Sequence, residues 1–420
     1  MNYNIQRVRI SVILLLIFLF QAQSIYAQCN CNHSTLILSL DGFRWDYPEK
    51  THTPTLNQIA KEGVKAVSLI PSFPTKTFPN HYTIATGLYP DNHGIVNNSF
   101  YDPAFDKAYS MSDKKERFNP AFYGGEPIWI TAQNQGLITA SFFWVGTDVG
   151  IMGKHPDEWK MYDGSVPFID RIDTIVKWLS RAPENRPRLI LAYYEEPDGA
   201  GHDYGPDDPR TLDVVYEIDS LTGVLYSRLK NLPNGNCINF IVVSDHGMGS
   251  VSSDKNIALA DYLPKSWPVR IEGSNPFFNL YMDSLWIDSA YNSLKPVKNI
   301  KVWKPEEVPV YLNYGKNQRA GNIIIVADSG WSVSLKKPMK MSYGGTHGYD
   351  ITNSDMHGIF YASGPDFKKA YIHPSFQNTD IYSLLSEILG ITPAETDGNL
   401  GNVIEMLNPE YSNRKELIHH

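Results

Sequence analysis

The sequence contains little cysteine, no excess of basic residues and only one long hydrophobic run. Its three cysteines are Cys29, Cys31 and Cys237, and this odd number excludes a complete disulfide framework. Cys29 and Cys31 lie too close together in the sequence to bridge each other easily, so either one could pair with Cys237. The fold must therefore depend on its hydrophobic core, and the spacing offers no cysteine-based zinc site.

The sequence also lacks the positive charge of proteins that bind nucleic-acid backbones. Its formal net charge is −8 and its pI is about 5.8, which excludes a nucleic-acid duplex as the expected partner. A small anionic substrate remains compatible, because metal ions can neutralise its charge locally. The 420 residues are 42% hydrophobic and 20% charged, a globular composition long enough for one large domain or two smaller ones.

The one long hydrophobic run lies at the N-terminus, where residues 1–28 resemble an export signal peptide. Two arginines precede an unbroken apolar stretch at 12–20, and Ala27 ends a plausible cleavage site. The stretch is too short for a comfortable membrane span. Because Gln28 is a poor residue before a lipidated cysteine, we expect simple secretion. The destination is periplasmic or extracellular, and the mature chain has no stable membrane span.

Apolar runs alternate with helical patterns along the mature chain, 29–420. Strands are expected at 35–40, 64–70, 138–144, 189–194, 238–243 and 356–362, and helices at 53–62, 168–179, 212–229 and 381–388. This alternation predicts an α/β fold with a mostly parallel central sheet that is flanked by helices on both faces. Residues 248–345 are less regular and could form a smaller lobe inserted into the sheet domain.

A proline-rich stretch, 71–90, follows the second predicted strand. Its prolines break strand pairing, and a helix is expected to begin after Pro79. Thr75, Lys76 and Thr77 would then lie on a stiff turn, where backbone N–H groups and the helix dipole favour an anion. Taken alone, a rigid structural turn explains this stretch better than a functional site does.

Three predicted strands end in acidic residues. Asp41 follows the first of them, Asp198 follows the strand at 189–194, and Asp245 with His246 follows the strand at 238–243. A single acidic strand end means little, because Asp-Gly is also a common turn. Three such ends favour a site, because ligands of open α/β sheets bind beyond the carboxyl ends of the strands.

Two more histidines complete this set of candidate ligands. Asp198 and His202 are four residues apart, and the two glycines between them predict a loop that could bend both side chains to one ion. His347 lies in a glycine-rich loop; for both segments the alternative is an ordinary surface loop. Aspartate and histidine without cysteine suit zinc, and six such residues suit two ions, with a threonine hydroxyl completing one of them. The other histidines, His81 among them, are expected to be structural or at the surface.

In their order along the chain, these motifs resemble the nucleotide pyrophosphatase/phosphodiesterase family of the alkaline phosphatase superfamily. The resemblance covers roughly residues 36–364. The motifs are Asp41, the Lys-Thr-Phe-Pro-Asn-His-Tyr stretch that contains Thr77, Asp198 with His202, Asp245 with His246, and Gly-Thr-His347-Gly-Tyr.

The resemblance implies an alkaline-phosphatase-like fold over 29–420 and two zinc ions per chain. One ion would be held by Asp198, His202 and His347. The other would be held by Asp41, Asp245 and His246, with Thr77 as a further ligand and as the nucleophile.

The resemblance also implies the residues that contact substrate. Asn98 matches an asparagine that hydrogen-bonds a phosphoryl oxygen, and Phe78 and Tyr162 match aromatic residues that sandwich the nucleobase. Asp163 stands where the nucleotide-hydrolysing vertebrate members have asparagine, which affects an amide contact but not the stacking. Because every base has a π-face, we expect broad use of nucleoside triphosphates, dinucleotide polyphosphates and nucleotide sugars.

The expected activity is hydrolysis of nucleotide phosphodiester and pyrophosphate bonds through a phospho-threonine intermediate, with release of 5′-nucleoside monophosphates. The neutral amide of Asn98 suits a singly charged diester better than a monoester dianion. The alternatives are a choline-phospholipid phosphodiesterase, a phosphomonoesterase on the same metal site, or a binding protein that has lost catalysis. The serine and arginine clamp of many phosphomonoesterases are not evident, and the complete ligand set argues against lost catalysis. Nothing in the sequence indicates the oligomeric state.

Overall fold

The computed structural model describes residues 32–336 and 344–409. The predicted signal peptide at 1–28 lies outside these ranges, and so do Cys29 and Cys31. Cys237 is disulfide-bonded. Within the described ranges, no helix combines the length and the apolar character needed to cross a membrane.

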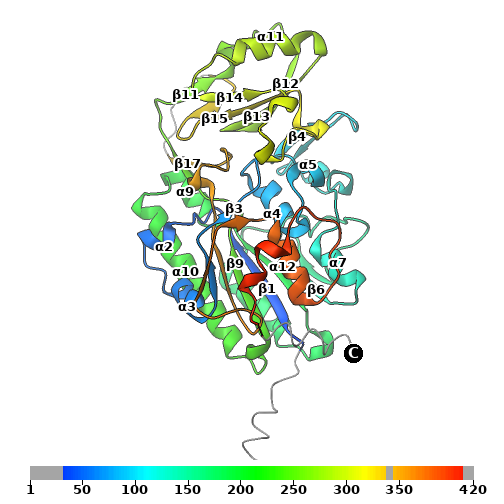
Figure 1. The fold of residues 1–420 in the computed structure, drawn as a ribbon, viewed down its shortest axis with the longest axis vertical. Helices are drawn as coiled ribbons and strands as arrows, with labels where there is room; N and C mark the ends of the chain where they lie inside the picture. The colour runs from blue at the N-terminus through cyan, green and yellow to red at the C-terminus, as the bar shows by residue number, and fades with distance from the viewer. Residues whose placement is uncertain (1–31, 337–343, 410–420) are drawn as a thin grey trace, which may run out of the picture.

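An eight-stranded sheet forms the centre of the larger part of the molecule (Figure 1). β1 pairs in parallel with both β8 and β9, and only β18 runs antiparallel to its two neighbours. This sheet confirms the predicted mostly parallel α/β architecture. In spatial order the strands are β19 (Tyr371–His373), β2 (Val64–Ala66), β18 (Phe360–Ser363), β9 (Ile238–Val243), β1 (Ser34–Leu40), β8 (Leu189–Tyr194), β6 (Thr139–Phe142) and β7 (Glu158–Lys160).

The side chains of β1 alternate between two hydrophobic cores, one on each face of the sheet. Leu36, Leu38 and Leu40 enter the first core, and Ile37 enters the second. A strand that is covered on both faces is apolar along most of its length, which is why the sequence predicted it clearly. The helices on the first face are α3 (Pro54–Glu62), α8 (Phe168–Leu179) and α10 (Pro209–Lys230); those on the second are α4 (Thr77–Thr86), α7 (Ile128–Asn134) and α12 (Asp380–Leu389).

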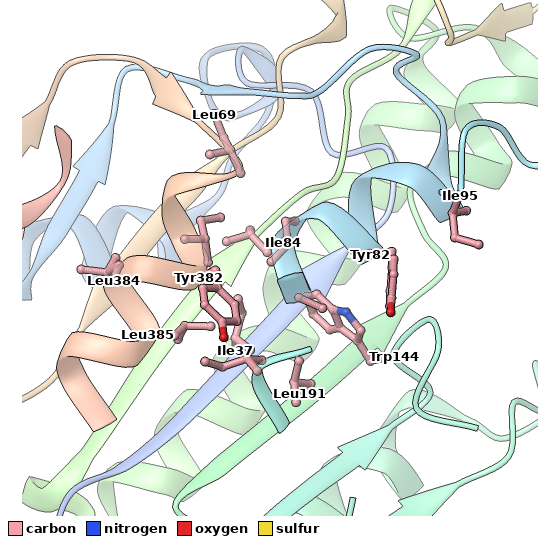
Figure 2. Packing of buried hydrophobic residues seen from close by; sticks show 14 of the residues in the cluster. Ile37, Leu69, Tyr82, Ile84, Ile95, Trp144, Leu191, Tyr382, Leu384 and Leu385 are labelled. Carbon is pink, nitrogen blue, oxygen red and sulfur yellow. The ribbon is translucent and has the colours of Figure 1, made fainter. Parts of the chain in front are cut away.

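The second core fixes the position of α4. Figure 2 shows Tyr382 and Leu385 of α12 close to Ile84 of α4, with Ile37 and Leu191 of the sheet beside them. All five side chains are fully buried. Truncating one such side chain typically costs about 2–5 kcal/mol, so the packing holds α4, and with it Thr77, firmly against the sheet.

A second sheet of four antiparallel strands lies above the first in Figure 1, with α11 (Ser284–Leu294) on one face. On its other face, Phe277, Ile324 and Val326 join the same core cluster as Ile37. This lobe is therefore packed against the main sheet domain. Its strands are β12 (Val269–Ser274), β13 (Phe277–Met282), β15 (Ile323–Ala327) and β14 (Ile300–Trp303).

Four two-stranded sheets and several short helices lie outside the two larger sheets among the described residues. The paired strands are β3 (Leu69–Ile70) with β20 (Phe376–Gln377), β4 (Ser99–Asp102) with β5 (Lys107–Ser110), β10 (Gly249–Val251) with β17 (Gly344–Thr346), and β11 (Asn256–Ala258) with β16 (Ser332–Ser334). The short helices are α2 (Tyr47–Lys50), α5 (Pro90–His93), α6 (Lys114–Arg117) and α9 (Asp198–Tyr204).

Two predicted strands differ from the observed ones. The run at 64–70 forms two strands, β2 and β3, because the chain leaves the main sheet at the exposed Val67 and pairs with β20 instead. The run at 356–362 begins with a 3₁₀ turn, Ser354–Met356, capped by the Asn353 side chain, and β18 follows it. In both cases the apolar run marks the position of a strand, but side-chain capping and strand pairing decide at which residues the strand begins and ends.

Candidate active site

Thr77 is the first residue of α4, so the prediction that this helix begins after Pro79 was wrong. Proline is tolerated within the first turn, because N–H groups there have no partner inside the helix. Thr77 therefore lies at a helix N-terminus, which favours bound anions. Its side chain is nearly buried, and its Oγ1 lies 3.2 Å from Nε2 of His246.

Asp41, Asp245 and His246 form a group beside Thr77, which we call the inner group. Asp41 follows β1 and Asp245 follows β9, and these strands are parallel neighbours, so their carboxyl ends meet. Nε2 of His246 lies 3.4 Å from Oδ1 of Asp41 and 3.1 Å from Oδ2 of Asp245. All three side chains are buried, and their potential ligand atoms lie within 4.8 Å of one another.

Asp198, His202 and His347 form the outer group. The first two lie on α9, so the predicted loop at 198–202 is wrong. The helix places both side chains on one face, with 3.5 Å between Oδ2 of Asp198 and Nε2 of His202. The glycines between them allow close packing: a Cβ on Gly201 would lie 3.0 Å from Met248. Glycine was needed here for space rather than to break the helix.

His347 joins the outer group to the inner one. It follows β17, and its Nε2 lies 3.6 Å from Oδ1 of Asp198. Its ring stacks on that of His246, with 3.5 Å between centroids. Ligand atoms of Asp198, His246 and His347 also lie within 4.8 Å of one another. The side chain of His202 is 39% exposed, so the outer group opens to solvent whereas the inner group does not.

Backbone carbonyls orient all three imidazoles. Nδ1 of His202 donates to the carbonyl of Gly345, that of His246 to Gly247, and that of His347 to Thr75, over 2.9, 2.9 and 2.8 Å. Because Nδ1 carries the proton in each case, each Nε2 presents a lone pair to the cluster. This tautomer is the one that binds metal ions, and such backbone contacts typically fix it.

Each carboxylate of the two groups has one buried oxygen that accepts no hydrogen bond from the described residues and lies near an imidazole nitrogen. These atoms are Oδ1 of Asp41, Oδ2 of Asp245 and Oδ1 of Asp198. Burial raises the pKa of Asp41 and Asp245 well above their usual values, and repulsion from the neighbouring carboxylates raises both further. Unpartnered buried carboxylates facing imidazole lone pairs fit divalent cations that bind nitrogen and oxygen donors, as zinc does.

Asn98 lies just before β4 and contacts the start of α4. Its Oδ1 accepts a hydrogen bond of 2.9 Å from the backbone N–H of Phe78. Among the described residues its side chain makes no other hydrogen bond, so its amide nitrogen is free to donate. Phe78 itself is partly buried against the second core. The contact sets an amide donor beside the helix N-terminus that carries Thr77.

Tyr162 is 41% exposed and packs edge-on against Phe143, with 5.3 Å between ring centroids. Its ring lies 6.2 Å from that of Tyr193, whose hydroxyl donates to Asp41, so Tyr162 borders the inner group through one intervening side chain. The Asp163 carboxylate accepts hydrogen bonds from Ser165 and is thus engaged within its own loop.

His81 contacts the inner group, although sequence reasoning gave it only a structural or surface role. It is fully buried, and its Nδ1 lies 3.0 Å from the carbonyl of Thr77 and 3.3 Å from Oδ2 of Asp245. Its Nε2 lies 2.9 Å from Oγ of Ser39. His81 follows Thr77 by four residues, one helical turn, so the signal was present once the helix is started at Thr77.

Lys76 connects the nucleophile segment to the lobe, and sequence reasoning missed this contact too. Its buried ammonium donates to the carbonyl of Asn275 over 2.7 Å and to Oγ of Ser274 over 3.3 Å. Burial lowers the pKa of Lys76 to about 7. The residue before Thr77 is therefore tied to the turn between β12 and β13.

Comparisons with known proteins identify relatives of this chain. A family model described as type I phosphodiesterase/nucleotide pyrophosphatase matches residues 35–350. The chain is 36% identical over 397 residues to human ectonucleotide pyrophosphatase/phosphodiesterase family member 1, covering 90% of this chain and 42% of that protein. It is 37% identical over 405 residues to venom phosphodiesterase 2 of Crotalus adamanteus, covering 93% of this chain and 50% of that protein. The chain thus spans at most about half the length of these relatives.

A solved structure is also similar. It is murine ectonucleotide pyrophosphatase/phosphodiesterase 5, an inactive variant in complex with AMP. The TM-score is 0.86 at 37% sequence identity, and the match covers 90% of this chain and 100% of the other.

Proposed function

The chain belongs to the type I phosphodiesterase/nucleotide pyrophosphatase family, and we propose that it is a two-zinc nucleotide hydrolase. The proposed substrates are nucleoside triphosphates, dinucleotide polyphosphates and nucleotide sugars, each cleaved to release a 5′-nucleoside monophosphate. We also propose that the protein is exported, as residues 1–28 suggest.

One observation carries this proposal. The Thr77 hydroxyl lies at the N-terminus of α4, 3.2 Å from Nε2 of His246, and the same nitrogen faces two buried carboxylate oxygens that accept no hydrogen bond from the described residues. If Thr77 had only a structural role, the costly burial of carboxylates near the same histidine would have no explanation. When bound, two zinc ions would supply positive charge that lowers the pKa of a hydroxyl or water and neutralises phosphoryl oxygens.

Thr77 would act as the nucleophile of a two-step displacement. Its Oγ1 would attack phosphorus in line, so that the Oγ1–P bond forms while the bond to the leaving oxygen breaks. Water would then cleave the phospho-threonine ester, releasing the nucleoside monophosphate and restoring the hydroxyl. The amide nitrogen of Asn98 and the backbone N–H of Thr77 would hold the non-bridging oxygens.

The charge of these groups favours a diester. Asn98 contributes a neutral donor, and the backbone N–H of Thr77 at the start of α4 contributes partial charge only. A singly charged phosphodiester needs less neutralisation than a monoester dianion. This preference separates the proposed activity from that of a phosphomonoesterase on the same metal site.

The proposal is tested by comparing p-nitrophenyl thymidine 5′-monophosphate, p-nitrophenyl phosphate and p-nitrophenyl phosphorylcholine, each with zinc and with a chelator. We expect zinc-dependent hydrolysis with the nucleotide diester as the best substrate. Preference for the monoester would identify a phosphatase, and preference for the choline ester would identify a phospholipid-type diesterase. If the chain binds no zinc and hydrolyses none of them, catalysis has been lost.

A separate prediction concerns the nucleobase. Tyr162→Ala should raise KM for p-nitrophenyl thymidine 5′-monophosphate by roughly 5- to 150-fold, because aromatic stacking contributes about 1–3 kcal/mol per base. Hydrolysis of bis(p-nitrophenyl) phosphate, which has no base, should change little.

Tyr216→Ala is a suitable control for this variant. Tyr216 is also exposed, but it lies on α10 and contacts neither group of candidate ligands. Equal KM values for Tyr162→Ala and the unaltered chain would exclude stacking on Tyr162.

A further inference from the structure

Tyr193 is the penultimate residue of β8 and lies opposite Ser39 of β1. Successive side chains of a strand point to opposite faces. Tyr194 accordingly enters the first core, where its ring stacks on Phe168 with 4.1 Å between centroids. Tyr193 points the other way, and its ring lies 5.1 Å from that of His81. It therefore borders the inner group without being one of its candidate ligands.

The Tyr193 hydroxyl makes a short hydrogen bond to Asp41. It donates to Oδ2 of Asp41 over 2.6 Å, while Oδ1 accepts no hydrogen bond from the described residues and lies 3.4 Å from Nε2 of His246. A phenol at neutral pH is a donor to a carboxylate, and such charge-assisted bonds are about twice as strong as neutral ones. The bond thus decides which oxygen of Asp41 faces the cluster.

The carboxylate of Asp245 is also held through one of its oxygens, while the other faces His246. Its Oδ1 accepts from the backbone N–H of Gly42 over 3.2 Å and from Oγ of Ser244 over 3.5 Å, and its Oδ2 lies 3.1 Å from Nε2 of His246. Each carboxylate of the inner group therefore has one oxygen held by the protein and one turned to the shared centre. For Asp245 the shorter of these bonds comes from the backbone, whereas for Asp41 the donor is a side-chain hydroxyl that can be removed.

We propose that Tyr193 is a positioning residue that holds Asp41 as a one-oxygen ligand and thereby sets how tightly the inner group retains its ion. This inference rests on the proposed zinc-dependent function. Without the hydroxyl, Oδ2 of Asp41 would lose its donor and the carboxylate could rotate. Loss of such a supporting hydrogen bond typically weakens metal binding by about 10- to 100-fold.

Tyr193→Phe removes only the hydroxyl, and Tyr194→Phe is a matched control on the same strand. The Tyr194 hydroxyl makes only a long 3.5 Å contact to the carbonyl of Phe168. Zinc affinity would be measured by competition with a chromogenic chelator, together with the zinc content per chain. We expect Tyr193→Phe to weaken one of two zinc equivalents by roughly 10- to 100-fold, and Tyr194→Phe to bind like the unaltered chain.

Thermal unfolding gives a readout that is independent of activity. In limiting zinc, Tyr193→Phe should melt below the unaltered chain, and excess zinc should close most of this gap. Unchanged zinc affinity in Tyr193→Phe would overturn the inference, and so would an equal loss in Tyr194→Phe, since general packing would then explain the effect. If the unaltered chain itself bound no zinc, the proposed function would fail instead.

Discussion

Thr77→Ala should abolish turnover of nucleotide diesters while leaving the fold and the bound zinc intact. The hydroxyl is the only group at the start of α4 placed to attack phosphorus from beside the inner group, with Oγ1 3.2 Å from Nε2 of His246. Removing a nucleophile that acts together with its surrounding groups typically costs about 10³-fold or more in kcat. The side chain is small and lies at a helix end, so the core described above should not be disturbed.

Thr77→Ser provides the matched comparison, because it keeps a hydroxyl at the same position. It should retain zinc and show measurable turnover, whereas Thr77→Ala should retain zinc and show almost none. Steady-state assays would be paired with metal analysis and far-ultraviolet circular dichroism of each variant. Near-normal kcat in Thr77→Ala would exclude a phospho-threonine intermediate and would favour direct attack by water.

Much of the fold could be predicted from the sequence, because the central strands are buried on both faces. The runs at 35–40, 189–194 and 238–243 are almost continuously apolar, and each forms a strand in the expected place. The residues at which strands begin and end were less predictable where they depend on pairing with distant segments. The break at Val67 arises because β3 pairs with β20, more than 300 residues further along the chain, and no local pattern records that contact.

Some residues of the candidate site could likewise be predicted from the sequence, and others could not. Acidic strand ends drew attention to Asp41 and Asp245, because parallel strands bring their carboxyl ends to one edge of the sheet. The helix at Asp198 was missed because its two glycines resemble a loop unless the packing of Gly201 against Met248 is known. Tyr193 was missed because its role depends on which face of β8 it occupies and on how β8 aligns with β1. The roles of all these residues in catalysis stay predictions until the variants are measured.

Removing the metal should also have a large effect on both activity and stability. A chelator should eliminate diester hydrolysis, and added zinc should restore it. Ligand binding at about 1,000 times Kd contributes roughly 4 kcal/mol per site, so loss of two ions should lower Tm by about 5–10 °C in a chain of this length. Differential scanning fluorimetry with and without zinc would measure this. An unchanged Tm and unchanged activity in chelator would exclude a metal-dependent site.

The charge of the inner group also affects how the stability of the metal-free protein depends on pH. Without metal, burial and mutual repulsion raise the pKa of Asp41 and Asp245, so the folded state binds protons more readily than the unfolded state. Stability from these groups is then lost as the pH rises through the raised pKa and regained as the pH falls. In the metal-free protein these two carboxyls should therefore contribute more stability as the pH falls, whereas the buried imidazoles of His246 and His347, whose pKa burial lowers, should contribute less.

Asp41→Asn separates the cost of this charge from the benefit of the metal. The amide keeps an oxygen that can accept the hydrogen bond from Tyr193, but it removes one buried negative charge. In chelator, Asp41→Asn should therefore be more stable than the unaltered chain, because an uncompensated buried charge destabilises the fold. In zinc the order should reverse, because the variant has lost a charged ligand. If Asp41→Asn were less stable under both conditions, the carboxylates would be satisfied by the protein alone and would need no ion.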